Sequence, residues 1–366
     1  MKEPAKNILG YGAILAAGLL LGSAIVGGTF PRHVEYDTSL FSNSTQNGIN
    51  KSLYRHAGKL QSSGNARDLA VSAFFLDSYQ PTRQVDSQAS VENIEQLRQA
   101  IASSPNDADL AWLEATDCAR LFKACDKQNA IRRLNRIEPD NLAVHLLEFN
   151  QASMNRDDGA RDMALNDMAN SRYSDIHYFS LGGLYYDALR NWNSPVTLKA
   201  SEFFQDDTDQ TPVTIEEQRK MIAIGYSAAS AIPALQFISA FCKRTDLNQE
   251  QLQNCKSVAR LMTTDKTIVV RRIGLRIGIA VFKHSPEAEQ WRAAYLQSHW
   301  LSSQYAVPSK HHSGRDSFKA WPNMDEFSMM KQKLAAEGIP LSPPAGWMPD
   351  SEEIQKLLVV PAVSNP

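Results

Sequence analysis

The sequence predicts an all-α protein, and three observations lead to that prediction. Apolar residues recur at spacings of three and four, as in Val91, Ile94, Leu97 and Ile101, which is the stripe of an amphipathic helix. The body of the chain shows no succession of period-two strands. Finally, helix-start motifs between residues 105 and 175 recur with a period of 34 residues.

Composition places the chain among globular proteins and limits its partners. The 366 residues are 43% apolar and 21% charged, and leave room for one large or two modest domains. The net charge of −2 lacks the basic excess of most nucleic-acid-binding proteins. We therefore expect no nucleic-acid partner.

The segment from Ile8 to Phe30 predicts a transmembrane helix. It contains no charged residue and is long enough to cross a hydrocarbon core of about 30 Å. Lys2 and Lys6 precede it, whereas Arg32 is the only Lys or Arg between residues 31 and 50. This bias favours a cytoplasmic N-terminus over residues 1–7 and a body in the periplasm, with the chain crossing a bacterial inner membrane once.

A cleaved signal peptide is the alternative for residues 8–30, and the protein would then be secreted. Gly22-Ser23-Ala24 and Val26-Gly27-Gly28 are both suitable cleavage sites, but the apolar run exceeds the usual signal core, which favours the anchor. Gly18 and Gly22 form a GxxxG pair that could bring two membrane helices together as a homodimer. Such pairs are also common in membrane helices that do not dimerise.

Residues 31–64 predict a polar linker, since they are rich in Ser, Asn, Thr and Gln without sustained periodicity. A first helical domain is expected over residues 65–200. Within it Pro105-Asn106-Asp107 recurs 34 residues later as Pro139-Asp140-Asn141, and a further step reaches Tyr173-Ser174-Asp175. Each motif is a suitable helix start.

Residues 90–190 resemble the tetratricopeptide repeat (TPR), a helix–turn–helix unit of this length, and the junction at 137–141 looks like the usual boundary between such units. The resemblance implies TPR-like antiparallel helical hairpins stacked as an α-solenoid, with a concave surface for a peptide or protein. Generic antiparallel helices are the alternative.

A second helical domain is expected over residues 201–338. Thr214 or Ile215 starts a helix that Pro233 should interrupt, and another helix begins near Asn248. Residues 267–282 are apolar on two sides, which predicts a buried helix whose two glycines, Gly274 and Gly278, allow a neighbouring helix to cross closely.

The remaining segments predict two more helices and a tail. Ser285-Pro286 marks one helix start, and Asn323 to Glu326 is typical of a capping box for a helix that ends at Gly338. A polar loop is expected over residues 303–322. Residues 339–366 form a proline-rich tail that we expect along the surface of the helices.

The four cysteines form two sequence-local pairs, Cys118 with Cys125 and Cys242 with Cys255. In an exported protein, even and local pairs predict disulfides that join neighbouring helices. Free buried thiols are the alternative. A redox site would favour C-x-x-C, which is absent.

No other pattern in the sequence predicts a catalytic, cofactor or metal site. His284, His299, His311, His312 and Asp316 have ligand chemistry but match no known metal-ligand spacing, and familiar hydrolase and nucleotide motifs are absent. Two further sets of residues each form a stripe along a predicted helix. Core packing best explains the first stripe, Trp291, Tyr295 and His299. Ion pairs with carboxylates of adjacent helices best explain the second, Arg272, Arg276 and Lys283.

These observations favour a membrane-anchored, non-enzymatic scaffold of the bacterial envelope that binds a protein or peptide. An envelope enzyme with its site in the C-terminal half, near the histidines and tryptophans, is the first alternative. A secreted effector or its neutralising partner is the second.

Overall fold

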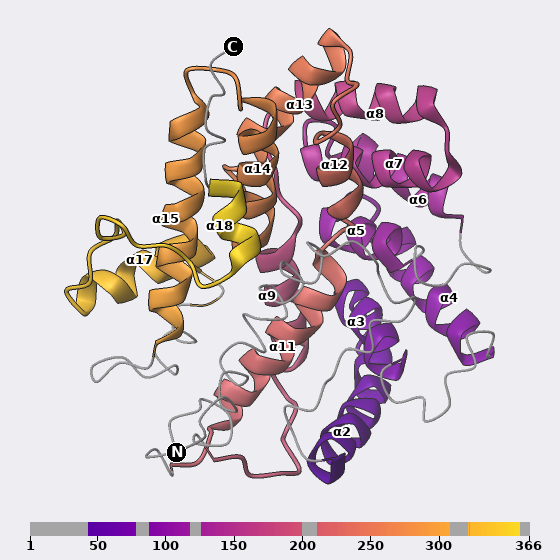
Figure 1. Cartoon of the computed structure of the whole chain (residues 1–366). Helices are drawn as coiled ribbons and strands as arrows, with labels where there is room; N and C mark the ends of the chain where they lie inside the picture. The colour runs from indigo at the N-terminus through magenta and orange to yellow at the C-terminus, as the bar shows by residue number, and fades with distance from the viewer. Residues whose placement is uncertain are drawn as a thin grey trace, which may run out of the picture.

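The structure of the protein is a computed structural model that describes residues 43–77, 88–117, 126–199, 211–307, 321 and 323–358. These residues form fifteen helices and no β-strand (Figure 1). The helices are α2 (Asn43–Gln61), α3 (Ala66–Asp77), α4 (Gln88–Ser103), α5 (Ala108–Asp117), α6 (Lys127–Ile137), α7 (Leu142–Asn155), α8 (Asp158–Asn170), α9 (Tyr178–Ala188), α11 (Ile215–Ala231), α12 (Gln236–Phe241), α13 (Gln249–Met262), α14 (Ile268–Val281), α15 (Ala288–Ala306), α17 (Glu326–Ala336) and α18 (Glu352–Leu358). The all-α prediction is confirmed for this part of the chain.

The predicted membrane anchor, residues 8–30 with Gly18 and Gly22, lies outside the described residues. Within the described ranges, no helix combines the length and the apolar character needed to cross a bilayer.

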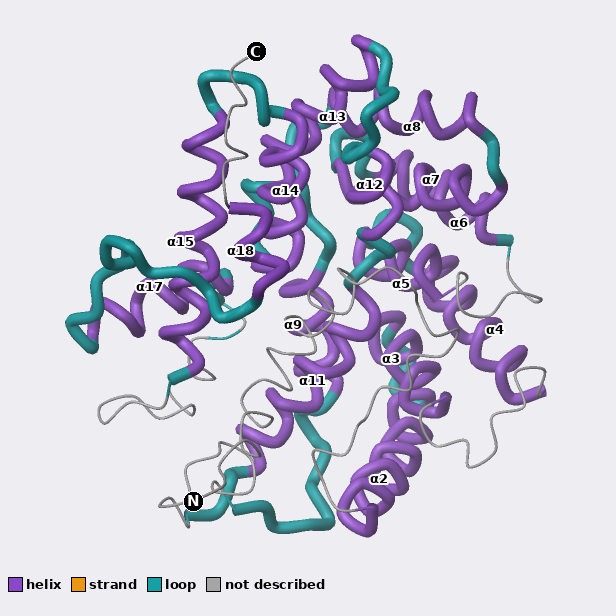
Figure 2. The backbone as a smooth tube through the Cα atoms, viewed as in Figure 1, coloured by secondary structure: helices purple, strands orange, loops and turns teal. Residues whose placement is uncertain are grey.

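Helices that follow one another in the described parts of the chain pack as adjacent pairs (Figure 2). The pairs include α2 with α3, α5 with α6, α7 with α8, α9 with α11, and α13 with α14. Between α7 and α8 the chain turns at Arg156, whose φ of 56° is left-handed and ends α7. A two-helix unit of this kind is compatible with a helical-repeat fold.

The predicted linker over residues 31–64 is wrong in its second half, because residues 43–61 form helix α2. The segment is mostly polar, but Ile49, Leu53, Ala57 and Leu60 lie three or four residues apart and are buried, and the helix packs against α3. These few apolar residues are enough to bury one side of the helix. The helix is stabilised mainly by tertiary packing, which the weak periodicity of the sequence did not indicate. The buried side chains of α2 are Ile49, Leu53, His56, Ala57 and Leu60.

The 34-residue period appears in the structure as three equivalent helix-start turns. Asp107, Asn141 and Asp175 each accept a hydrogen bond on their side chain from the backbone N–H two residues later, at 3.1, 3.1 and 2.8 Å. Asn141 also donates from Nδ2 to the backbone oxygen of Asp175 at 2.9 Å. The turns therefore share one local geometry, and two of them are joined directly.

Helix α11 begins and ends where the sequence predicts. Thr214 and Glu217 form a capping box, each side chain accepting the other residue's backbone N–H. The helix stops at Ala231, before Pro233, whose ring and missing N–H prevent a helix from continuing. Asn248 starts α13 with a second capping box.

Helix α14 is buried around most of its circumference, as the sequence predicts, between α13 and α15. A Cβ built on Gly274 would lie 2.7 Å from Cβ of Met262 in α13. A Cβ on Gly278 would collide with the ring of Trp291 in α15. The two glycines thus allow two different helices to approach closely.

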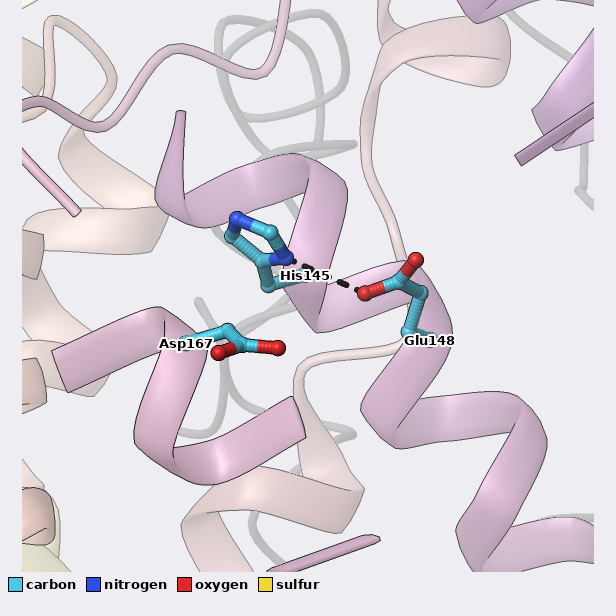
Figure 3. Close-up of side chains that lie close together, drawn as sticks. All are labelled: His145, Glu148 and Asp167. Carbon is cyan, nitrogen blue, oxygen red and sulfur yellow. Dashed lines mark hydrogen bonds and ion pairs between the residues drawn. The ribbon is translucent and has the colours of Figure 1, made fainter. Parts of the chain in front are cut away.

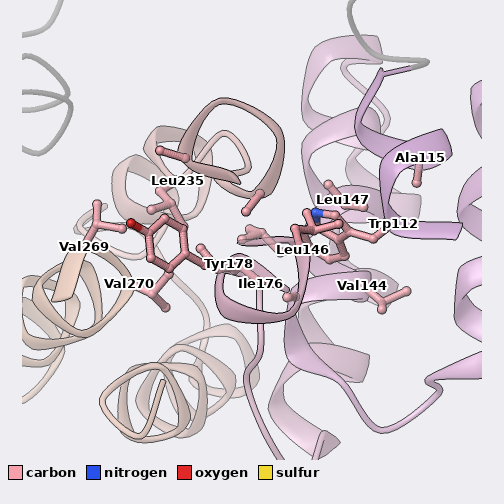
Figure 4. Close-up of a cluster of buried hydrophobic side chains, with 14 of the residues drawn as sticks. Trp112, Ala115, Val144, Leu146, Leu147, Ile176, Tyr178, Leu235, Val269 and Val270 are labelled. Carbon is pink, nitrogen blue, oxygen red and sulfur yellow. The ribbon is translucent and has the colours of Figure 1, made fainter. Parts of the chain in front are cut away.

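One hydrophobic core joins the two predicted domains, since a single cluster of buried side chains runs from Ile49 to Trp321. Figure 4 shows Tyr178 of α9 beside Leu235, Val269 and Val270 from the second half of the chain. The predicted boundary at 200/201 lies at a segment outside the described residues, and the core contains residues from both sides of it.

Two helix starts in the C-terminal half differ from the prediction. Helix α15 begins at Ala288, two residues after Pro286. Helix α17 is capped by Asp325, not by Asn323. Glu326 does not complete the expected capping box, because its buried carboxylate instead accepts the first backbone N–H of α14 at 2.6 Å. The hydrogen bond between Glu326 and α14 thus takes the place of the capping-box bond expected with Asn323.

The predicted proline-rich tail contains a short helix, α18, which the scattered prolines before it did not suggest. Upstream of α18, Trp347 packs edge-on against Trp300 of α15 with ring centroids 5.1 Å apart. Trp300 Nε1 also donates to the backbone oxygen of Pro340 at 2.7 Å. The described part of this segment therefore lies against the helices.

Candidate functional site

A polar hollow of about 610 Å³ opens at the turn between α4 and α5. The turn supplies one wall, and the other walls come from α3, the end of α6 and the start of α9. Its position follows from the repeat, because two of the three equivalent turns, at Asp107 and Asp175, contribute to it. The lining residues are Arg67, Ser104, Pro105, Asn106, Asp107, Ala108, Asp109, Glu138, Asp175, His177 and Ser180.

His177 is at the centre of the charged groups under this hollow. It is the N-cap of α9, with a left-handed φ of 60°, and its side chain is buried. Nδ1 lies 2.9 Å from Oδ1 of Asp109, and Nε2 lies 2.9 Å from Oε2 of Glu138. The ring also packs over Trp112, with centroids 4.9 Å apart.

The two carboxylates keep His177 charged. Burial by itself lowers the pKa of His177, but the hydrogen bonds and charges of Asp109 and Glu138 outweigh it and raise the pKa to about 9. Because an ionised carboxylate only accepts, both ring nitrogens donate and His177 is an imidazolium at neutral pH.

The pKa values of the two carboxylates shift in the opposite direction to that of His177. Burial raises the pKa of Asp109, but hydrogen bonds from His177 and Ser180 outweigh it, and the pKa is lowered. Burial also raises the pKa of Glu138, but the hydrogen bond and charge of His177 and the hydrogen bond of Asn141 together outweigh it, and the pKa is lowered. Glu138 additionally accepts from Nδ2 of Asn141 at 2.8 Å. The result is a fixed row of alternating charges.

Ser180 gives the hollow the composition of a Ser-His-Asp triad, but the geometry is different. Its Oγ donates to Oδ1 of Asp109 at 2.5 Å and lies 3.5 Å from Nδ1 of His177. In a triad the histidine accepts the serine proton, which requires a free nitrogen lone pair. His177 has none, because both nitrogens donate to carboxylates. The arrangement orients charges and does not activate a nucleophile.

Carboxylates outnumber cations around the hollow. Asp107, Asp109, Glu138 and Asp175 line it, with Arg67 and His177 as the positive groups. Arg67 binds Asp107 through Nε at 2.7 Å and Nη2 at 3.1 Å. Lys266, which does not line the hollow, has its Nζ 3.2 Å from Oδ2 of Asp175. The chain's own cations therefore show that these carboxylates accept guanidinium and ammonium groups.

The structure brings together one of the two predicted cysteine pairs. Cys242 and Cys255 form a disulfide with Cα atoms 5.7 Å apart, which joins the end of α12 to α13. Cys118 and Cys125 lie outside the described residues.

The histidines considered from the sequence do not assemble into a site. His284 is exposed in the turn after α14, and His299 lies eleven residues into α15, about 16 Å along the helix axis. Burial, and then the charges of Arg272 and Arg276, lower the pKa of His299 to about 3, so its ring is neutral. His311, His312 and Asp316 lie outside the described residues.

The first stripe packs in the core, as predicted. In the second stripe Lys283 is exposed, and Arg272 binds oxygens of Ser298 in α15 in place of the predicted carboxylate partner. Trp291 stacks on Phe282 with centroids 5.0 Å apart, and Tyr295 is buried beside His299. Arg272 donates from Nη2 to the backbone oxygen of Ser298 at 3.0 Å.

Three side chains that could hold a metal ion lie between α7 and α8 (Figure 3). They are His145 and Glu148 from α7 and Asp167 from α8, and their ligand atoms lie within 4.8 Å of one another. The sequence interpretation missed both this group and the hollow. The signal available for the first was the His-x-x-Glu spacing on one helix face, and for the second the 34-residue period.

No protein-family model matches the chain, and no curated protein or solved structure compared with it matches either.

Proposed function

We propose that the chain is a non-enzymatic, TPR-like helical-repeat scaffold that binds a protein or peptide partner at the hollow beside the α4–α5 turn. The observation that supports this best is the row of charges under the hollow. His177 is held by Asp109 and Glu138, so the carboxylates around the opening are already oriented before a partner arrives. A segment of the partner that carries Lys or Arg matches this lining.

The chemistry of the site favours binding over catalysis. Ser180, which lies beside the hollow's histidine, donates to Asp109, and the histidine is positively charged. The predicted alternative, an enzyme with its site in the C-terminal half, has less support, because His299 is neutral and packs against Tyr295.

Peptide selection on the full chain tests the proposal. We expect peptides selected from a random library to carry Lys or Arg and to compete with one another for one site. Their affinity should fall about tenfold in the double variant Asp107→Asn, Asp175→Asn, since two charges near a cationic group contribute about 1.4 kcal/mol together. Asparagine keeps both turns intact, because Asn141 already makes the same turn at the equivalent position.

A matched control removes a charge elsewhere. Glu250→Gln alters an exposed carboxylate in the first turn of α13 and should leave the affinity unchanged. Selection of peptides without basic residues, or equal affinity for the double variant and the wild type, would show that the hollow is not the binding site.

We also propose that this scaffold is anchored in a bacterial inner membrane by residues 8–30, with its body in the periplasm and a dimer contact through Gly18 and Gly22. The disulfide between Cys242 and Cys255 supports an oxidising compartment. Protease added to spheroplasts should degrade the body of the membrane-bound chain. Protection of the body under these conditions would place it in the cytoplasm, and a mature chain that begins after Ala24 or Gly28 would indicate secretion.

A further inference from the structure

We propose that His145, Glu148 and Asp167 bind one divalent transition-metal cation, such as Zn²⁺, between α7 and α8. The site is independent of the hollow and of the proposed partner. Its three side chains come from two helices that pack against each other, with His145 and Glu148 three residues apart on one face of α7. Facing helices with this spacing supply metal ligands in helical bundles.

The distances suit a common metal ion. His145 Nδ1 lies 3.0 Å from Oε2 of Glu148. Two ligand atoms bound to one tetrahedral zinc at about 2.0–2.1 Å lie about 3.3 Å apart, so these two atoms are already near their bound separation. Asp167 is exposed, and its carboxylate points toward the other two side chains (Figure 3). One of its carboxylate oxygens lies within 4.8 Å of the ligand atoms of His145 and Glu148.

The buried histidine is oriented as a metal ligand. Its Nε2 lies 2.9 Å from the backbone oxygen of Pro139, and a carbonyl oxygen only accepts, so Nε2 carries a hydrogen. This leaves Nδ1 directed at Glu148 and Asp167. A backbone carbonyl on the far nitrogen is the usual support of a histidine that binds metal through the near one.

Glu148 has a matching support. Its Oε1 accepts a hydrogen bond from Nδ2 of Asn135 in α6 at 3.1 Å, which leaves Oε2 on the side of His145. Each of the two α7 ligands is therefore fixed by a second residue on the side away from the metal position.

The charges at this position also favour a cation. The carboxylates of Glu148 and Asp167 lie beside the ring of His145, and the ligand atoms of the three side chains are within 4.8 Å of one another. A divalent cation there would have one nitrogen and two oxygen ligands from the protein, with water completing the shell.

The test uses the untagged full chain, stripped with a chelator and titrated with zinc chloride. We expect one zinc ion per chain, and a rise in melting temperature at saturating zinc because the ion binds only the folded hairpin. Glu148→Gln and Asp167→Asn should each weaken zinc binding at least about tenfold. His284→Ala, which removes an exposed histidine elsewhere, should bind as the wild type does.

Substitution of the exposed Asp167 keeps the test decisive if the buried positions do not tolerate change. A second measurement is the absorption of bound Co²⁺, which should report a four-coordinate site with nitrogen and oxygen ligands in the wild type and be lost in Asp167→Asn. Failure of the wild type to bind zinc at about 100 µM, or equal binding by the wild type and both carboxylate variants, would overturn the proposal. Neither result would bear on peptide binding at the hollow.

Discussion

Asn141 and Asp175 lie 34 residues apart and exchange two hydrogen bonds. Asn141 Nδ2 donates to the backbone oxygen of Asp175 at 2.9 Å, and the Asp175 N–H donates to Oδ1 of Asn141 at 3.1 Å. The same Oδ1 accepts the N–H of Ala143 at the start of α7. One fully buried amide therefore caps a helix and fixes the position of two equivalent helix-start turns relative to each other.

Replacing this amide should be costly. Asn141→Ala removes the cap and both bonds to Asp175 and leaves buried backbone groups without partners, so we expect the free energy of unfolding to fall by about 2–4 kcal/mol in urea titrations. Asn170→Ala is the control, because its side chain makes one exposed bond to the preceding turn. A loss at Asn141 no larger than at Asn170 would mean that the relative position of the two turns is held by side-chain packing alone.

The charge on His177 predicts a pH dependence of stability. Its pKa is about 9 in the folded chain and 6.5 when unfolded. Because the folded value is the higher one, the stabilisation is fully present below pH 6.5 and is lost as the pH rises toward 9. The shift corresponds to about 3 kcal/mol across this window.

The variant His177→Asn isolates that contribution. Asparagine tolerates the left-handed backbone at this position but does not titrate, so the decline in stability between pH 6.5 and 9 should flatten. At pH 6.5 the variant should be less stable than the wild type, since Asp109 and Glu138 lose the cation between them. Urea titrations at several pH values measure both effects. The surface variant His284→Asn should show the same decline in stability with pH as the wild type. If His177→Asn also showed that decline unchanged, the decline would come from other titrating groups.

The sequence predicted the features of the fold that depend on neighbouring residues. Thr214 and Asn248 cap their helices through residues three positions later, and Pro233 stops α11 by its own geometry. Helix α2 was missed because its stripe of Ile49, Leu53 and Leu60 is diluted by polar residues. That helix is stabilised by α3, which no local pattern can indicate.

The hollow was not predicted because its charged residues, which lie far apart in the sequence, meet only in the tertiary structure. Asp109 and His177 are 68 residues apart, which is two periods, and each follows an equivalent turn by two residues. Glu138 joins them from the end of α6. Aligning the turns would have placed Asp109 and His177 at equivalent positions, but their contact depends on tertiary geometry that the period alone does not give.

The two glycine positions in α14 and α11 should respond in opposite ways to alanine. Gly278→Ala places a methyl group against the ring of Trp291, and overpacking of this kind should cost about 1–3 kcal/mol. Gly225→Ala has open space around it and replaces glycine within a helix, so it should stabilise the chain by about 0.5–1 kcal/mol. Thermal unfolding of both variants gives the comparison. Similar effects of the two substitutions would mean that α15 can move away from α14 at little cost.

The disulfide between Cys242 and Cys255 should contribute measurably to stability. It closes a loop with a sequence separation of 13, for which the loss of unfolded-chain entropy corresponds to about 3 kcal/mol. We expect the double variant Cys242→Ala, Cys255→Ala to lose about 2–4 kcal/mol of unfolding free energy. Reduction of the wild type should have a similar effect.

Thiol counting on the same double variant tests the other predicted pair. If Cys118 and Cys125 are joined, the denatured and unreduced variant has no reactive thiol, and reduction releases two. Reactive thiols before reduction would show that Cys118 and Cys125 are free. Because both cysteine pairs were predicted from export of the chain, that outcome would also weaken the proposed periplasmic location, whereas two closed pairs would require an oxidising compartment for folding.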